Sequence, residues 1–163
     1  MSSAFDVAEA AIRVEYRRLC GIFGLSQIAL DVYVCDESST ATTSLGFPLA
    51  NCDPLYSGTK NQIALPLTSA MDQWPTVVPT FPPASLAKVA DEWPVWRIEL
   101  WHEVVHQVSN DICKAWNPKE PPRVRTNGSR STTGHGAGWF AGIQHAAAKL
   151  SVEADALDEL LDQ

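Results

Sequence analysis

Between Pro94 and Trp116, apolar residues recur at intervals of three and four, which constrains the fold more than any other feature of this chain. Residues at this spacing share one face of a helix and pack against a core. The residues of this face are Ile98, Trp101, Val105, Val108 and Ile112. Pro94 suits the first turn of a helix, and the prolines that follow Trp116 would end it. The sequence therefore predicts a long core helix.

Two histidines, His102 and His106, lie four residues apart on this helix. Residues at that spacing are one turn apart on the same face, so both imidazoles can reach one ion, and zinc readily accepts neutral imidazole. Glu103 would project beside the metal, where it can take a proton from zinc-bound water and pass it to a leaving amine. The segment His102-Glu103-Val104-Val105-His106 thus predicts a zinc-dependent hydrolase, with a peptide bond as its target.

The same segment has a plainer interpretation, because HExxH is a short pattern that arises by chance. It could be a solvated helix face on which Glu103 pairs with His106, three residues away. A catalytic zinc also needs a third protein ligand and an open coordination position. The rest of the chain has to supply that ligand.

Three other residues are candidates for the third ligand. His135 lies in Gly134-His135-Gly136, where flanking glycines allow the backbone to turn sharply at the start of a helix. His145 falls in the middle of the same predicted helix, and packing or exposure there is its simpler role. Glu120 could offer a carboxylate, but it stands among prolines rather than on a helix. His135 is therefore the preferred third ligand.

Taken together, the segments WHEVVHQV and GHGAGWF resemble the SprT-like metallopeptidases, which include the Spartan group. The family pattern is HExxH on a helix, followed by a histidine in a His-Gly-x-x-aromatic segment that opens the next helix. The matching residues are His102, Glu103, His106, His135, Gly136 and Trp139. The resemblance covers roughly residues 4–150, and its specific part is about fifty residues long.

This resemblance implies an α+β, zincin-like fold, in which an active-site helix packs against a short, mostly antiparallel sheet. It also implies proteolysis with Zn²⁺ held by three histidines, and in the Spartan group the substrates are proteins crosslinked to DNA. This chain departs from the pattern because it has no CxxC zinc ribbon, an acidic composition and a long loop between His106 and His135. The first two departures remove the usual support for DNA binding.

The remaining segments fit a small α+β domain. Helices are expected at about 4–20, 85–92 and 139–150, and strands at 28–35, 40–45 and 61–67. Pro66 favours an edge position for the last strand, because proline cannot donate to a ladder. A proline-rich loop covers 74–83. We expect a single SprT-like zincin domain over 1–150, followed by an acidic tail over 151–163.

Charge argues against strong nucleic-acid binding. The net charge is −7, and without the five acids of the tail it would be −2, so the body of the chain is close to neutral. Arg123, Arg125 and Arg130 are candidate substrate-binding residues, because a loop folded over the cleft could present them to phosphates or an acidic peptide. The alternative is a solvated loop.

Several observations concern the setting of the protein. No run of about 18 apolar residues could span a bilayer, which predicts no membrane partner. The first residues lack the order of a signal peptide, so we expect an intracellular, cytoplasmic protein. The four cysteines form no CxxC pair and are expected to be small buried hydrophobes rather than disulfides.

Three functions follow from these observations. The first is a zinc endopeptidase acting on a protein or peptide. The second is a binding or assembly module with a closed, structural zinc site, in which Cys113 joins the histidines because it lies seven residues after His106 on nearly the same face. The third is a DNA-associated protease acting on protein–DNA crosslinks.

Overall fold

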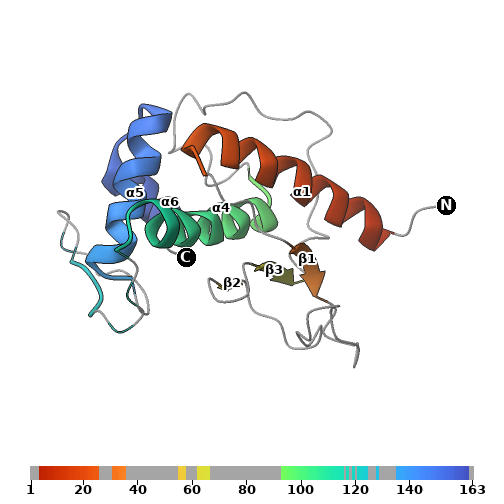
Figure 1. Ribbon diagram of the computed structural model, residues 1–163, viewed down its shortest axis with the longest axis horizontal. Helices are drawn as coiled ribbons and strands as arrows, with labels where there is room; N and C mark the ends of the chain where they lie inside the picture. Colours follow the sequence, from red (N-terminus) through yellow and green to blue (C-terminus); the bar gives the residue numbers. More distant parts are fainter. Residues whose placement is uncertain are drawn as a thin grey trace.

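In the computed structural model, the part of the chain that can be described comprises 4–25, 31–35, 55–57, 62–66, 93–115, 117, 119, 121–124, 128 and 135–161. The helices are α1 (Ala4–Phe23), α4 (Val95–Gln107), α5 (Ala137–Leu150) and α6 (Ala154–Leu161), and a π-helical turn, η1 (Val108–Ile112), continues α4. The strands are β1 (Asp31–Cys35), β2 (Leu55–Ser57) and β3 (Gln62–Pro66). Helices and a small sheet confirm the α+β class (Figure 1).

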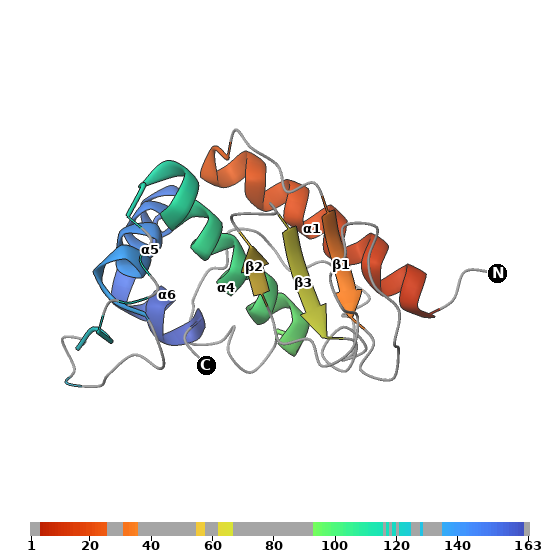
Figure 2. The ribbon, with the colours of Figure 1, turned by 60° about the horizontal axis from the view of Figure 1, so that its bottom comes forward.

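The three strands form one sheet in the order β1-β3-β2. Figure 2 shows β1 and β3 running the same way, with β2 running the opposite way. For the described strands the prediction of a mostly antiparallel sheet is wrong, since five residues of β1 pair in parallel with β3 and three residues of β2 pair antiparallel with it. Parallel pairing needs a connection of about a dozen residues or more, and 36–61 supplies it.

The edge position expected for Pro66 is also wrong, because β3 is the central strand. Pro66 is the last residue of that strand, and the pairing with β2 ends at Ala64. The missing N–H of the proline therefore removes no hydrogen bond to β2.

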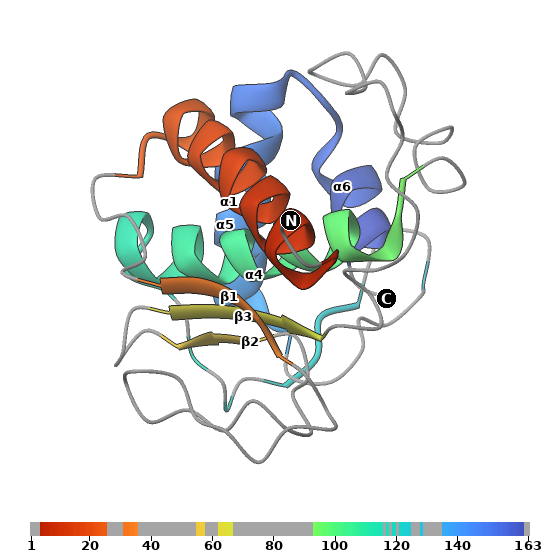
Figure 3. The same cartoon turned by 90° about the vertical axis from the view of Figure 1, so that its right-hand side faces the viewer.

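Helix α4 occupies the centre of the molecule. Figure 3 shows α1 and α4 on the same side of the sheet, and α4 also contacts α5 and α6. Four residues of the predicted face (Ile98, Trp101, Val105 and Val108) are buried, and Ile112 is partly buried. Leu100 and Val104 are buried as well. Helices α1, α5 and α6 and the sheet all contact α4, so more than one face of this helix is covered.

The acidic segment predicted as a tail also packs into this core. After α5, Ser151 adopts a left-handed conformation with φ of 57°, which turns the chain back. Helix α6 then buries Leu157, Leu160 and Leu161 against α4 and α5. Asp155 and Glu159 lie outside this buried face, whereas Asp158 is buried with the leucines.

Some expectations lie outside the described residues: the strand at 40–45, the loop at 74–83 and the helix at 85–92. None of the described helices combines the length and apolar character needed to cross a membrane.

An ion pair joins α1 to α4 inside the core. Arg97 Nε donates to Glu15 Oε1 over 2.8 Å, and Trp101 Nε1 donates to the same oxygen over 3.1 Å. Both charged side chains are buried, and the Arg97 guanidinium lies 4.0 Å from the centre of the Trp93 ring. Burial lowers the pKa of Arg97, while Glu15 acts against that shift.

Removing one partner of this pair should be costly. Glu15→Ala leaves the buried Arg97 charge without its carboxylate, so we expect the free energy of unfolding to fall by about 3–5 kcal/mol. Glu9→Ala is the matched control, because Glu9 pairs with Arg13 one turn away on the exposed face of α1. That change should cost less than about 1 kcal/mol. Urea denaturation followed by circular dichroism measures both, and equal losses would contradict the assigned role.

Candidate metal centre

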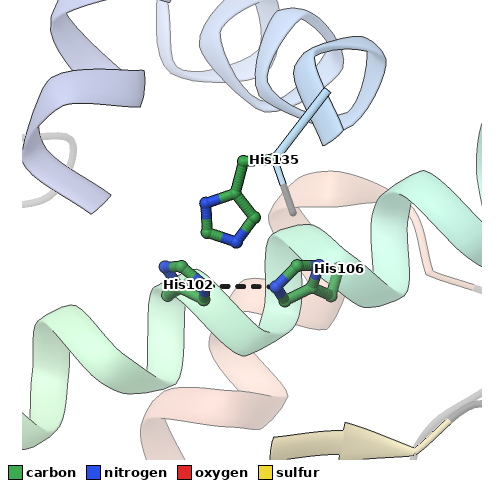
Figure 4. Close-up of side chains that lie close together, drawn as sticks. All are labelled: His102, His106 and His135. Atoms are coloured by element: carbon green, nitrogen blue, oxygen red, sulfur yellow. Dashed lines mark hydrogen bonds between the residues drawn. The ribbon is translucent and has the colours of Figure 1, made fainter. Parts of the chain in front are cut away.

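His102 and His106 project from the same side of α4, one turn apart, as their spacing predicts. Their Nε2 atoms face each other at 3.1 Å (Figure 4). Two atoms bound to one tetrahedral zinc at about 2.0–2.1 Å would lie about 3.3 Å apart. The two imidazoles are therefore already spaced as ligands of a shared ion.

His135 reaches this pair from the segment just before α5. Figure 4 shows its ring above the two histidines of α4. The ligand atoms of the three residues all lie within 4.8 Å of one another, which is close enough to bind one metal ion. His135 is buried, and its carbonyl accepts the backbone N–H of Arg123 over 2.9 Å. His135 is 33 positions after His102 and 29 positions after His106 in the sequence, yet the three side chains lie together.

A backbone carbonyl sets the orientation of His102. Its Nδ1 contacts the carbonyl oxygen of Leu161, the last residue of α6. A carbonyl only accepts hydrogen bonds, so Nδ1 carries the proton and donates. In the neutral ring Nε2 then keeps its lone pair, and Nε2 is the nitrogen that faces His106.

Glu103 lies under the edge of the sheet and is only 4% exposed. Burial raises the pKa of Glu103 to about 8; the backbone N–H of Tyr56, which donates to the carboxylate, lowers it, and the charge of Glu99 raises it. A carboxyl with a pKa near neutrality can both accept and release a proton, which is what a general acid–base group requires. Strand β2, which carries Tyr56, fixes this side chain.

Trp139 packs against all three histidine rings. Its ring stacks on that of His135 with centroids 4.4 Å apart and an interplanar angle of 16°. The centroids of the His102 and His106 rings lie 4.6 Å and 4.5 Å from it. Trp139 is four residues after His135, so the first turn of α5 places the indole against the cluster.

The backbones of α5 and the end of α4 approach closely at Gly142. A Cβ built there would collide with Ser109 Oγ and lie 2.9 Å from the carbonyl oxygen of Val105. Ser109 belongs to η1, and its hydroxyl donates to the carbonyl of Trp139 over 3.3 Å. Such π-helical turns often occur at functional sites. Here η1 supplies a hydroxyl that ties α5 to the histidine-bearing helix.

The other candidates lie outside this cluster. His145 Nε2 lies 2.8 Å from the carbonyl oxygen of Phe23, and His145 is not one of the three grouped histidines. The Cys113 thiol donates to the carbonyl of Ala141 over 3.5 Å and lies outside the cluster of three histidines. Cys113 and Cys20 are both free thiols, half-buried and buried respectively. Glu120 lies outside the described residues.

Of the three candidate substrate-binding arginines, only Arg123 lies within the described residues. The Arg123 guanidinium pairs with Asp155 and Asp158 of α6 at 2.9 Å and 3.2 Å. It also lies 3.3 Å from the centre of the Phe140 ring. Arg123 therefore joins α6 to α5 rather than facing the histidines, and Arg125 and Arg130 lie outside the described residues.

Sequence reasoning missed three groups at this site: the amide of Tyr56, the carbonyl of Leu161 and the carboxylate of Asp158. The first two are backbone atoms, which no side-chain pattern reveals. Asp158 belongs to the acidic segment, and only the leucines near it in the sequence indicate that its side chain could be buried.

No protein-family model, curated protein or solved structure matches this chain. The likeness to SprT-like peptidases consequently depends on the motif residues of the sequence alone.

The contact at Gly142 can be tested by one substitution made at two glycines. Gly142→Ala should force α5 away from α4 and lower the free energy of unfolding by about 1–3 kcal/mol. Gly21→Ala on α1 is the control, because its Cβ would meet nothing within 4 Å. That variant should gain up to about 1 kcal/mol from the higher helix propensity of alanine. Urea denaturation measures both free energies of unfolding. If the two variants change in the same direction, the packing of α5 on α4 does not depend on the close contact at Gly142.

Proposed function

We propose that this protein is a zinc-dependent endopeptidase. The observation that carries the proposal is the convergence of His102 and His106 of α4 with His135 from the segment just before α5, while Glu103 follows His102 on α4. Three neutral imidazoles with one open position are a frequent ligand set of catalytic zinc. The likeness of both motifs to SprT-like peptidases supports a peptide bond as the substrate.

The donor set fits a zinc ion. His102 and His106 have their Nε2 atoms 3.1 Å apart, and His135 lies on the same side of both (Figure 4). When bound, zinc would supply an acidified water molecule and polarise the carbonyl of the substrate. His102 would bind through Nε2, because its Nδ1 contacts the Leu161 carbonyl.

Glu103 would act as the general base. Its carboxylate takes a proton as the nucleophile forms and delivers it to the amine that leaves, so the same group serves both steps. The amide of Tyr56 holds the carboxylate on the β2 side of α4. Because Glu103 is buried, few water molecules compete for its proton.

The second and third functions receive less support from the described residues. A closed structural zinc site needs a fourth protein ligand, and the Cys113 thiol points to the Ala141 carbonyl instead. A DNA-directed role needs accessible positive charge, whereas Arg123 is paired with two carboxylates. A catalytic site with three ligands is therefore the function that the geometry favours.

Metal binding should depend on His135 and be independent of His145. The protein with its natural sequence should bind one zinc per chain, and His135→Ala should weaken binding by more than about 100-fold, because a direct ligand is lost. His145→Ala removes an imidazole from the same helix region but only its contact with Phe23, so zinc binding should be retained. Competition with a chromophoric chelator measures both affinities. Equal zinc binding in all three proteins would contradict the ligand assignment.

Cleavage should depend on Glu103 without any change in zinc content. Glu103→Gln keeps the size of the side chain and an oxygen for the Tyr56 amide, so the fold and the metal should remain. The rate of peptide cleavage should fall by at least about 100-fold, the usual contribution of a general base. Mass spectrometry of an unstructured peptide mixture, incubated with either zinc-loaded protein, gives the rate. Equal cleavage by both proteins, or none by the natural sequence, would refute the proposal.

A further inference from the structure

Helix α6 contacts one histidine of the cluster and also Trp139, whose ring packs on the cluster. Near its middle, Asp158 accepts the indole N–H of Trp139 over 2.8 Å. At its end, the Leu161 carbonyl meets His102 Nδ1. Asp158 and Leu161 are three residues apart, so they lie on the same face of the helix. A segment that follows all the motif residues in the sequence thus contacts two elements of the site.

Asp158 is held as a structural anchor rather than a surface acid. It is 1% exposed, and each carboxylate oxygen has its own donor: Oδ1 accepts from Trp139 and Oδ2 accepts from Arg123 over 3.2 Å. A buried carboxylate with two donors is stabilised in one position. The backbone N–H of Arg123 in turn donates to the His135 carbonyl. The carboxylate therefore links α6 to Trp139, whose ring stacks on His135, and to Arg123, whose backbone contacts His135.

The contact at Leu161 meets a need of the helix itself. The last carbonyls of a helix have no N–H partner within the helix, and they carry partial negative charge. The His102 ring supplies a donor at that point and is oriented in return. Hydrogen bonds of this kind to metal-binding histidines fix the tautomer and the ring, and their loss usually weakens metal binding.

From these contacts we infer that Asp158 is a positioning residue for the metal centre: it fixes α6 and Trp139 so that His102 and His135 face one ion. This inference rests on the proposed zinc site and assigns a function to the acidic C-terminal helix. Asp158 itself touches none of the three histidines in the contacts described. It acts through Trp139, whose ring stacks on His135, and through the Leu161 carbonyl one turn later.

The test compares two acids of α6 that bind the same arginine. Asp158→Asn leaves one side-chain oxygen, which can accept from Trp139 or from Arg123 but not from both. Asp155→Asn removes a similar charge, but Asp155 is partly exposed and pairs with the other terminal nitrogen of Arg123. Both substitutions conserve shape, so the two variants differ in the contact with Trp139 and in the burial of the acid.

The measurements are zinc affinity by chelator competition and the visible spectrum of the Co²⁺-loaded protein, which reports the geometry of the ligands. We expect Asp158→Asn to weaken zinc binding by about 10–100-fold and to alter the Co²⁺ spectrum. Asp155→Asn should change the affinity by less than about threefold, because a partly exposed ion pair contributes little. Urea denaturation of the metal-free proteins shows how much each variant loses in stability.

Two further variants separate positioning from a general loss of stability. Glu15→Ala weakens the contact of α1 with α4 and changes neither Asp158 nor Trp139, so its folded molecules should keep the natural zinc affinity and Co²⁺ spectrum. If Asp158→Asn does not fold, Trp139→Phe replaces it, because this change keeps a ring against His135 and removes the N–H that Asp158 accepts. Its Co²⁺ spectrum should also shift.

The outcomes distinguish this inference from the proposed function. Zinc binding by the natural sequence together with an unchanged affinity and spectrum in Asp158→Asn, or in Trp139→Phe, would overturn the inference alone. Equal weakening by Asp155→Asn would also overturn it, since the effect would then come from charge. Absence of zinc binding in the natural sequence would refute the proposed zinc site, and the positioning role with it.

Discussion

The close packing of α5 on α4 is the contact on which the candidate site depends. Gly142 allows the two helix backbones to approach, and the Ser109 hydroxyl bonds to the carbonyl of Trp139 at the same place. Trp139 lies about one turn before Gly142 on α5, and its ring packs on the histidines of α4. His135 lies just before the start of α5. A longer distance between these helices would separate His135 from His102 and His106, whatever the sequence of the motifs.

The parts of the structure that the sequence predicts best are those encoded by local spacing. The buried face of α4 and the pairing of His102 with His106 follow from the helical repeat, which acts over a few residues. The direction of β1 and β3 does not, because their pairing depends on the path of the 26 residues between them. The burial of α6 was obscured by its acids, although leucines at 157, 160 and 161 mark its inner face.

The groups of the candidate site can be divided in the same way, into those that the sequence reveals and those that it does not. The histidines and Glu103 are side chains with a recognisable pattern, so the sequence points to them. The groups that orient them are the amide of Tyr56 and the carbonyl of Leu161, and every residue has such atoms. Only the fold determines which amide or carbonyl reaches a given side chain. Identifying the ligands from a sequence is therefore easier than identifying what holds them in place.

The buried polar residues of α4 show why Glu103 differs from its neighbours. Arg97 is paired with Glu15, and Gln107 Oε1 accepts the hydroxyl of Tyr16 over 2.9 Å, so both are matched by α1. Glu103 is as deeply buried, yet within the described residues its pKa is lowered only by an amide and by no cation. Burying a carboxylate without a positive partner is unfavourable. If the three histidines bind a divalent ion, as proposed, that ion would bring positive charge to the same helix and lower the pKa of the Glu103 carboxyl.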